Sequence, residues 1–289
     1  MQGAPVISPG ASPARRQGLA HATQALGAIV ARELYKFSRQ TGRLLSAIVR
    51  PLLWLAVFAA GFRNVFGIAV SEPYDTYVTY DVYIAPGLLG MVLLFNGMQG
   101  SLAMVYDREM GLMRLLLAAP LPRWWLLLCK LFATAVVSLV QAAVFIVAAA
   151  LLGTQLPVLG AHAPQVLMAV VTSALMLASL GLLLSVHIRQ LENFAGAMNF
   201  VIFPMYFIST ALYPLWKLEE SGATWVWRVA QWNPFTHAVE WMRYALYDKD
   251  AGIAPWVVLG TLVLCFGLAV RGYDPQSGFG RLAAKGGGA

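Results

Sequence analysis

Long, unbroken runs of apolar residues limit how this chain can fold more than any other feature of its sequence. Each run is about 20 residues long, which is the length that an α-helix needs to cross a bilayer. The runs do not alternate apolar and polar residues as membrane-spanning strands do. Only 11% of the 289 residues are charged, whereas a soluble domain carries roughly 25%. We therefore predict an all-α integral membrane protein.

Six of these runs are predicted to span the membrane, which places both ends of the chain on the same side. The predicted spans are residues 44–62, 83–105, 126–152, 165–186, 194–211 and 253–270. With their loops they form a transmembrane domain over 44–271, and residues 272–289 form a cytoplasmic tail. Pro204 predicts a kink in the fifth span. Arg50 lies near the start of the first span, where its long side chain can reach back to the headgroups.

The segment before the first span divides into a tail and a helix. Residues 1–18 are rich in Pro, Ala, Gly and Ser, which predicts a disordered cytoplasmic tail. Arg15-Arg16 could belong to a twin-arginine export signal, but the apolar run after them is weak and interrupted. Residues 19–43 predict a basic amphipathic interface helix on the membrane surface, with a soluble helix packed on a partner as the alternative. Its apolar positions are Leu26, Ile29, Val30, Leu34 and Phe37, and its basic positions are Arg32, Lys36, Arg39 and Arg43.

The segment between the fifth and sixth spans predicts short external helices. Residues 213–252 hold five of the nine tryptophans, a residue type that anchors proteins at headgroup level. Asn233-Pro234 predicts an N-cap and first turn, followed by a helix of about 14 residues, too short to span. Its predicted buried face comprises Phe235, Ala238, Val239, Met242, Ala245 and Leu246. We expect one or two interfacial or re-entrant helices here.

The distribution of basic residues predicts the orientation. The net charge is +7, and Lys and Arg gather in the N-terminal segments, the loop between spans two and three, the turn between spans four and five, and the C-terminal tail. These segments are therefore predicted to be cytoplasmic. The same rule accounts for the positive charge better than nucleic-acid binding does. Cys129 and Cys265 lie in apolar segments, where we expect free thiols rather than a disulfide or metal site.

The predicted spans lack the features of a self-powered pump. All Asp and Glu residues lie outside the apolar cores, which argues against coupling to protons or sodium ions. The chain has no phosphate-binding loop of the G-x-x-x-x-G-K-[ST] type, and no cluster of nucleophile, base and orienting residue. Asn96 and Gln99 in the second span favour a polar transport passage and helix packing about equally.

Four stretches, in order along the chain, resemble ABC-2 type transporter permeases. The first is R-E-L at 32–34 followed by RPLLWLAVFAAGF at 50–62. The second is PGLLGMVLLFNGMQGSLAMVYDREMGLMRLLLAAPLPRWWLLLCKL at 86–131. The third and fourth are FPMYFISTALYPL at 203–215 and NPFTHAVEWMRYALY at 233–247.

The resemblance implies a dimeric membrane subunit, expected as a homodimer, that docks two cytoplasmic ATP-binding subunits. ATP and Mg would bind to those partners, and this chain would bind no cofactor and no metal and catalyse no reaction. The interface helix and the loop after span two would receive the ATPase motion. The residues implied in this coupling are Asp107, Arg108, Glu109, Gly111, Arg114, Pro120 and Arg123. Candidates for the pathway, by their position in spans two and five, are Asn96, Gln99, Asn199 and Ser209. Candidates in the external helix are Asn233, Pro234, Glu240 and Arg243.

The function that the resemblance implies is export of a small amphipathic or hydrophobic compound across the bacterial inner membrane. The runner-up cargo is a lipo-oligosaccharide or polysaccharide. A different class, an ion-coupled or passive transporter, would work without any ATP-binding partner. A membrane enzyme or assembly scaffold is a third class, and the missing acid–base cluster disfavours the enzyme.

Overall fold

A computed structural model of the chain describes residues 19–39, 42, 49–57, 73–74, 79–111, 122–154, 156–157, 162–188 and 190–273. The predicted tails before residue 19 and after residue 273, most of the loop before the second span, and both ends of the first predicted span lie outside the described residues. So do residues 112–121 of the predicted coupling loop, which include the coupling candidates Arg114 and Pro120.

The described part of the chain is a bundle of long helices and contains no strand. The long helices are α3 (Tyr80–Glu109), α5 (Arg123–Leu151), α6 (Ala163–His187), α7 (Leu191–Phe207) and α11 (Ala254–Gly272). Their ends lie within four residues of the predicted ends of spans two to six. Four of them, α3, α5, α6 and α11, are long and apolar enough to cross a membrane. The all-α membrane class is thereby confirmed, while the count of six spans stays a prediction because only 49–57 of the first span are described.

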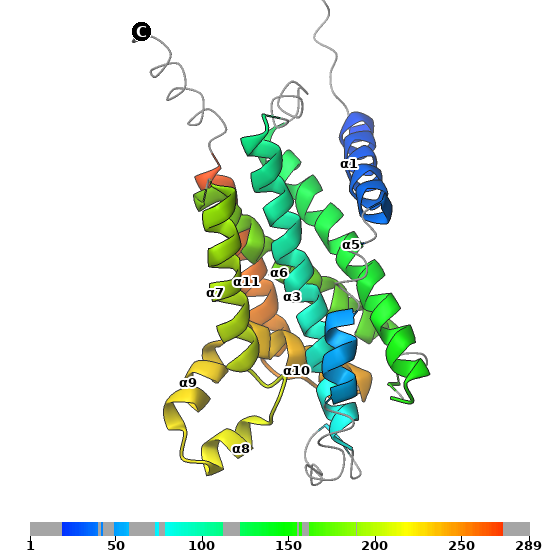
Figure 1. Cartoon of the computed structure of the whole chain (residues 1–289), viewed down its shortest axis with the longest axis vertical. Helices are drawn as coiled ribbons and strands as arrows, with labels where there is room; N and C mark the ends of the chain where they lie inside the picture. The colour runs from blue at the N-terminus through cyan, green and yellow to red at the C-terminus, as the bar shows by residue number, and fades with distance from the viewer. Residues whose placement is uncertain are drawn as a thin grey trace, which may run out of the picture.

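The helices cross the molecule in alternating directions. In Figure 1 they lie side by side along its long axis, with α1 (Leu19–Arg39) against α5 at one end and the short helices α8 (Leu215–Glu220) and α9 (Thr224–Trp232) at the other. The apolar face of α1 packs on α5: Ile29 is buried against Leu126 and Cys129. The Trp125 indole nitrogen also donates to the Ala22 carbonyl oxygen, at 3.2 Å.

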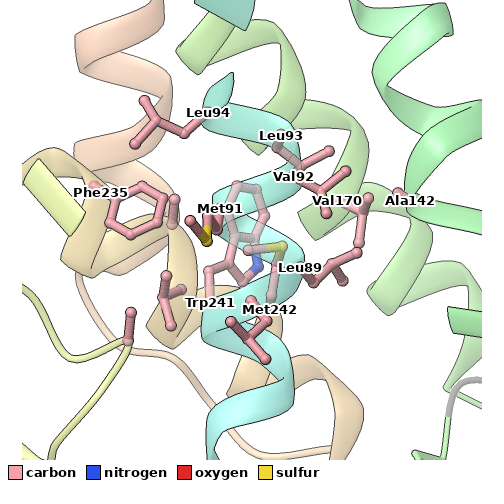
Figure 2. Packing of buried hydrophobic residues seen from close by; sticks show 14 of the residues in the cluster. Leu89, Met91, Val92, Leu93, Leu94, Ala142, Val170, Phe235, Trp241 and Met242 are labelled. Atoms are coloured by element: carbon pink, nitrogen blue, oxygen red, sulfur yellow. The ribbon is translucent and has the colours of Figure 1, made fainter. Parts of the chain in front are cut away.

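Helix α3 is the centre of the bundle, and 21 of its residues are buried. Figure 2 shows side chains from α5, α6 and α10 (Pro234–Leu246) meeting those of α3, among them Val170, Phe235 and Met242. Small residues permit close approach between α3 and α6. A Cβ added to Gly97 would lie 2.9 Å from the Leu177 carbonyl oxygen, so only glycine fits at this crossing.

The fifth predicted span is shorter than expected. It was predicted to reach residue 211, but α7 ends at Phe207, three residues after Pro204. Proline removes a backbone donor, and the next residues form a turn in which the Ser209 hydroxyl donates to the Tyr206 carbonyl oxygen. The side-chain nitrogen of Asn233 donates to the Met205 and Ile208 carbonyl oxygens, at 2.7 and 2.6 Å. These carbonyl groups at the end of the helix have no partner within it.

Helix α10 follows the prediction closely. The Asn233 side-chain oxygen accepts from the Phe235 amide at 3.0 Å, and Pro234 is the first helical residue. All six residues of the predicted apolar face are buried. The helix packs on α3, α6 and α11, so a sequence pattern with a cap, a proline and a 3.6-residue period was sufficient to place it.

Candidate functional site

A cavity of about 300 Å³ lies between the helical stretch 49–57, the middle of α3, and α7. We call it the mid-membrane groove. Its lining residues are Arg50, Trp54, Met91, Phe95, Asn199, Ile202, Phe203, Tyr206 and Phe207. Five of these side chains are aromatic and one is cationic. Ligand sites commonly combine an apolar wall with a few polar groups in a cavity of about this size.

The cation of the groove lies beside the middle of α3. The Arg50 guanidinium carbon is 4.3 Å from the centroid of the Phe95 ring, and Phe95 lies half-way along the 30 residues of α3. The guanidinium packs on an aromatic ring at mid-helix, and the prediction that Arg50 reaches back to the headgroups stays a prediction. A cation attracted to an aromatic ring loses little of its positive charge, so Arg50 can still receive an anion.

A smaller cavity, of about 10 Å³, adjoins the groove and shares Arg50 and Phe95 with it. Asn96, Gln99 and Gln141 also line this smaller cavity. The Asn96 side-chain nitrogen donates to the Gln141 side-chain oxygen. This bond leaves the other amide atom of each side chain, the Asn96 oxygen and the Gln141 nitrogen, buried without a hydrogen-bond partner in the described structure.

The four pathway candidates do not all meet. Asn96 and Gln99 line the small cavity, and Asn199 lines the groove next to it. Ser209 is fully buried in the turn after α7, where its oxygen accepts from the Ala211 amide, and it lines neither cavity. The sequence did not single out Arg50, Gln141 or the aromatic residues for this site, although a charged or amide side chain inside an apolar run, as at Arg50 and Gln141, was an available signal.

A second polar site joins α1 to the bundle. Asp107 near the end of α3 is 1% exposed. Its carboxylate oxygens lie 2.9 Å from an Arg32 guanidinium nitrogen, 3.5 Å from the Lys36 amine and 3.3 Å from the Lys130 amine. The Lys130 amine also lies 2.8 Å from a Glu33 carboxylate oxygen. We call these five residues the ion-pair cluster, and it connects α1, α3 and α5.

The other described coupling candidates lie at the end of α3 and the start of α5. A guanidinium nitrogen of Arg108 donates to the carbonyl oxygens of Ser185 and Ile188, at 2.9 and 2.8 Å, at the end of α6. Glu109 is exposed, and Arg123 is exposed at the first residue of α5. Gly111, in the turn after α3, has a φ of +75°, a backbone conformation that glycine adopts without strain. The exposed side chains of Glu109 and Arg123 are thus accessible to a partner protein, whereas Asp107 is buried and forms its ion pairs within this chain.

The C-terminal end of α11 lies close to the same surface. Burial raises the pKa of the Tyr273 hydroxyl, and the nearby guanidiniums of Arg108 and Arg123 offset part of that increase. The hydroxyl therefore stays protonated at neutral pH. The ends of α3, α6 and α11 and the start of α5 consequently meet in one basic surface, on the side where α1 packs.

Two candidates in the external helix form a clamp. Arg243 is 2% exposed, and one guanidinium nitrogen lies 2.5 Å from a Glu240 carboxylate oxygen. The other donates to the Thr210 carbonyl oxygen at 2.8 Å, and the guanidinium lies over the Tyr83 ring, 4.1 Å from its centroid. The clamp holds α10, α3 and the turn after α7 together on the side away from α1.

Residues 24–247 match the family model described as ABC-2 type transporter. The chain belongs to the ABC-2 type transporter family. Members are membrane subunits rather than ATPases, and the family implies a partnership with an ABC ATP-binding subunit. Together with the apolar helices, the family makes this chain a multi-pass membrane protein.

Curated relatives agree with this family assignment. The chain is 30% identical over 236 residues to a protein of Cyanophora paradoxa named putative transport permease ycf38, covering 79% of this chain and 76% of that one. It is 29% identical over 232 residues to the protein of the same name from Pyropia yezoensis, covering 78% and 75%. It is 26% identical over 188 residues to the probable multidrug ABC transporter permease YbhR of Escherichia coli strain K12, covering 64% of this ABC-2 chain and 49% of that one.

Proposed function

We propose that this chain is the permease subunit of an ATP-driven exporter that moves a small amphipathic or hydrophobic compound. The observation that carries the proposal is the mid-membrane groove, in a chain of the ABC-2 family. An aromatic wall with sparse polar groups suits a cargo that is apolar over most of its surface. A cavity of about 300 Å³ favours a small molecule over a polysaccharide chain.

The remaining parts of the proposal follow from the family and from charge. The chain would pair with a second copy of itself in the bacterial inner membrane, with both termini in the cytoplasm. A cytoplasmic ABC subunit would bind ATP and Mg and hydrolyse the nucleotide. The exposed Glu109 and Arg123 would contact that subunit, at the basic surface beside α1.

The ion-pair cluster would carry movement from this surface into the bundle. Three cations, from α1 and α5, surround one buried carboxylate on α3. A displacement of α1 without α3 would take the partly exposed Arg32 and Lys36 away from Asp107 and leave that buried carboxylate with fewer cationic partners, which is unfavourable. The three helices would therefore move together, and α3 also forms one wall of the groove.

The test uses the ABC ATP-binding subunit that copurifies with this chain from its native membranes. We expect the chain alone to hydrolyse no ATP, and the complex in lipid nanodiscs to hydrolyse it at a rate that the chain increases. Glu109→Lys places a cation at the proposed contact and should lower this stimulation severalfold. Glu219→Lys makes the same change on exposed α8, at the opposite end of the molecule, and should leave the rate unchanged. Equal rates in both variants would remove Glu109 from the coupling surface, and transport driven by an ion gradient without the ATP-binding subunit would refute the exporter.

A further inference from the structure

We infer that Arg50 makes the mid-membrane groove selective for amphipathic organic anions, whose acid group it binds while the aromatic wall holds their apolar body. This inference rests on the proposed function of the groove as the cargo site. It names the class of cargo and the residue that selects it.

The first observation is the position of Arg50. A charged side chain at the bilayer centre is costly and is kept where it has a partner or a function. In the described part of the chain no Asp or Glu lies within ion-pair distance of Arg50, and its guanidinium contacts the Phe95 ring. Guanidinium groups bind carboxylate and phosphate oxygens in a forked geometry. The groove thus holds a cation for which the described residues supply no carboxylate counter-ion.

The second observation is independent of charge. Asn96 and Gln141 are 3% and 1% exposed, and both line the cavity that Arg50 shares. One buried amide donor and one buried amide acceptor have no partner there. Exchanging the oxygen and nitrogen of both side chains would still leave one donor and one acceptor free. A carboxylate bound by Arg50 could accept from the free donor, and a neighbouring N–H or O–H of the same ligand could satisfy the acceptor.

The apolar body of the ligand would lie in the larger cavity. Trp54, Phe203 and Phe207 line the larger cavity beyond Arg50, and the Phe203 and Phe207 rings lie stacked, with centroids 6.2 Å apart. The Tyr206 hydroxyl, also on this wall, is buried without a hydrogen-bond partner. Flat aromatic surfaces and one hydroxyl suit a ligand of one or two rings that carries an acid at one end.

The acid group could belong to a soluble amphiphile or to the headgroup of an anionic lipid. Both present the same chemistry to Arg50. A competition experiment distinguishes the two sources. Phosphatidylglycerol added to the bilayer displaces the soluble anion from the groove only if the lipid headgroup occupies the same site.

The experiment compares three fluorescent probes that share one ring system: dansylglycine is anionic, dansylamide is neutral and dansylcadaverine is cationic. Each is titrated onto the full chain in phosphatidylcholine nanodiscs, with energy transfer from tryptophan as the signal. We expect the wild type to bind dansylglycine about tenfold more tightly than dansylamide, as a charge-assisted contact provides. Arg50→Gln should abolish this preference and leave dansylamide binding intact, and Arg50→Lys should keep most of it. Arg228→Gln, the same change on exposed α9, serves as the control.

Several results would overturn the inference. A wild type without preference for the anion would do so without any variant, and so would an Arg50→Gln protein that keeps the preference. A structural role only would be indicated by a wild type that shows no preference for the anion, together with an Arg50→Gln protein that binds all three probes equally more weakly. In that case Arg50→Lys would bind the probes like the wild type. If phosphatidylglycerol displaces dansylglycine from the wild type, the lipid headgroup occupies the same site, and the inference stands with an anionic lipid as the ligand. Binding that follows Arg50 in a complex that shows no ATP-driven transport would refute the exporter and leave this inference standing.

Discussion

Replacing Asp107 by Asn should loosen α1 from the rest of the protein. The substitution keeps the size of the side chain and removes one negative charge from the centre of the ion-pair cluster. Arg32 and Lys36 on α1 lose their partner at 2.9 and 3.5 Å. The link between Glu33 and Lys130, at 2.8 Å, remains.

The size of the effect follows from the exposure of each group. The side chains of Arg32 and Lys36 are each 37% exposed, so water compensates for much of each lost pair, and each contributes at most about 1 kcal/mol. The docking of α1 should therefore weaken by about 1–2 kcal/mol, or roughly tenfold in its opening equilibrium. Ile29 and Phe37 stay buried, and side chains of this kind contribute about 1.5–3 kcal/mol each. The apolar contacts outweigh the lost ion pairs, so α1 stays docked.

Hydrogen exchange read by mass spectrometry measures this change directly. Peptides from α1 of the Asp107→Asn protein in nanodiscs should exchange about tenfold faster than in the wild type, while peptides of α6 and α11 keep their rates. Glu192→Gln, which removes a carboxylate at an exposed position in the first turn of α7, is the control and should change nothing in α1. Unchanged exchange in α1 of Asp107→Asn, or the same acceleration in every helix, would refute the assignment of Asp107 as the anchor of α1.

Two further predictions concern the stability of the bundle, read as thermal unfolding in detergent. Gly97→Ala should destabilise the protein by about 1–3 kcal/mol, because its Cβ would meet the α6 backbone at 2.9 Å. Gly260→Ala in α11, with nothing within 4 Å, should be neutral or stabilise by up to about 1 kcal/mol; shifts of the same sign would contradict the close contact. Asn233→Ala should cost about 2–3 kcal/mol, because it removes the cap of α10 and two donors to the end of α7, whereas Asn233→Ser keeps a capping oxygen and should cost less. A melting temperature of Asn233→Ala equal to that of the wild type would show that neither contact matters.

Local patterns in the sequence were sufficient for the parts of the fold that depend on neighbouring residues. The four helices that are long and apolar enough to cross a membrane were predicted because helix length and apolar composition are read along one continuous stretch. Helix α10 was predicted to its buried face because its cap, its proline and its period all lie within 14 consecutive positions. The apolar stripe of α1 was found for the same reason, and Ile29 and Phe37 are indeed buried.

The features that depend on distant residues could not be read in this way. The end of α7 is stabilised by Asn233, which donates to carbonyl oxygens 25 and 28 positions earlier. The resemblance implied Asp107 in coupling to a partner, but not that its side chain is buried against Arg32 and Lys130, 75 and 23 positions away. The position of the Arg50 guanidinium depends on the Phe95 ring of another helix. Each requires knowledge of which helices are neighbours, and hydropathy does not contain that information.

The most direct test of the proposed exporter is ATP-driven accumulation of cargo in inside-out proteoliposomes that contain this chain and its ATP-binding subunit. With ATP and Mg added outside, we predict that dansylglycine accumulates in the lumen, that accumulation stops when the catalytic base of the ATP-binding subunit is removed, and that an ion gradient cannot replace ATP. Accumulation that continues without ATP hydrolysis, or that is driven by the gradient alone, would contradict the account.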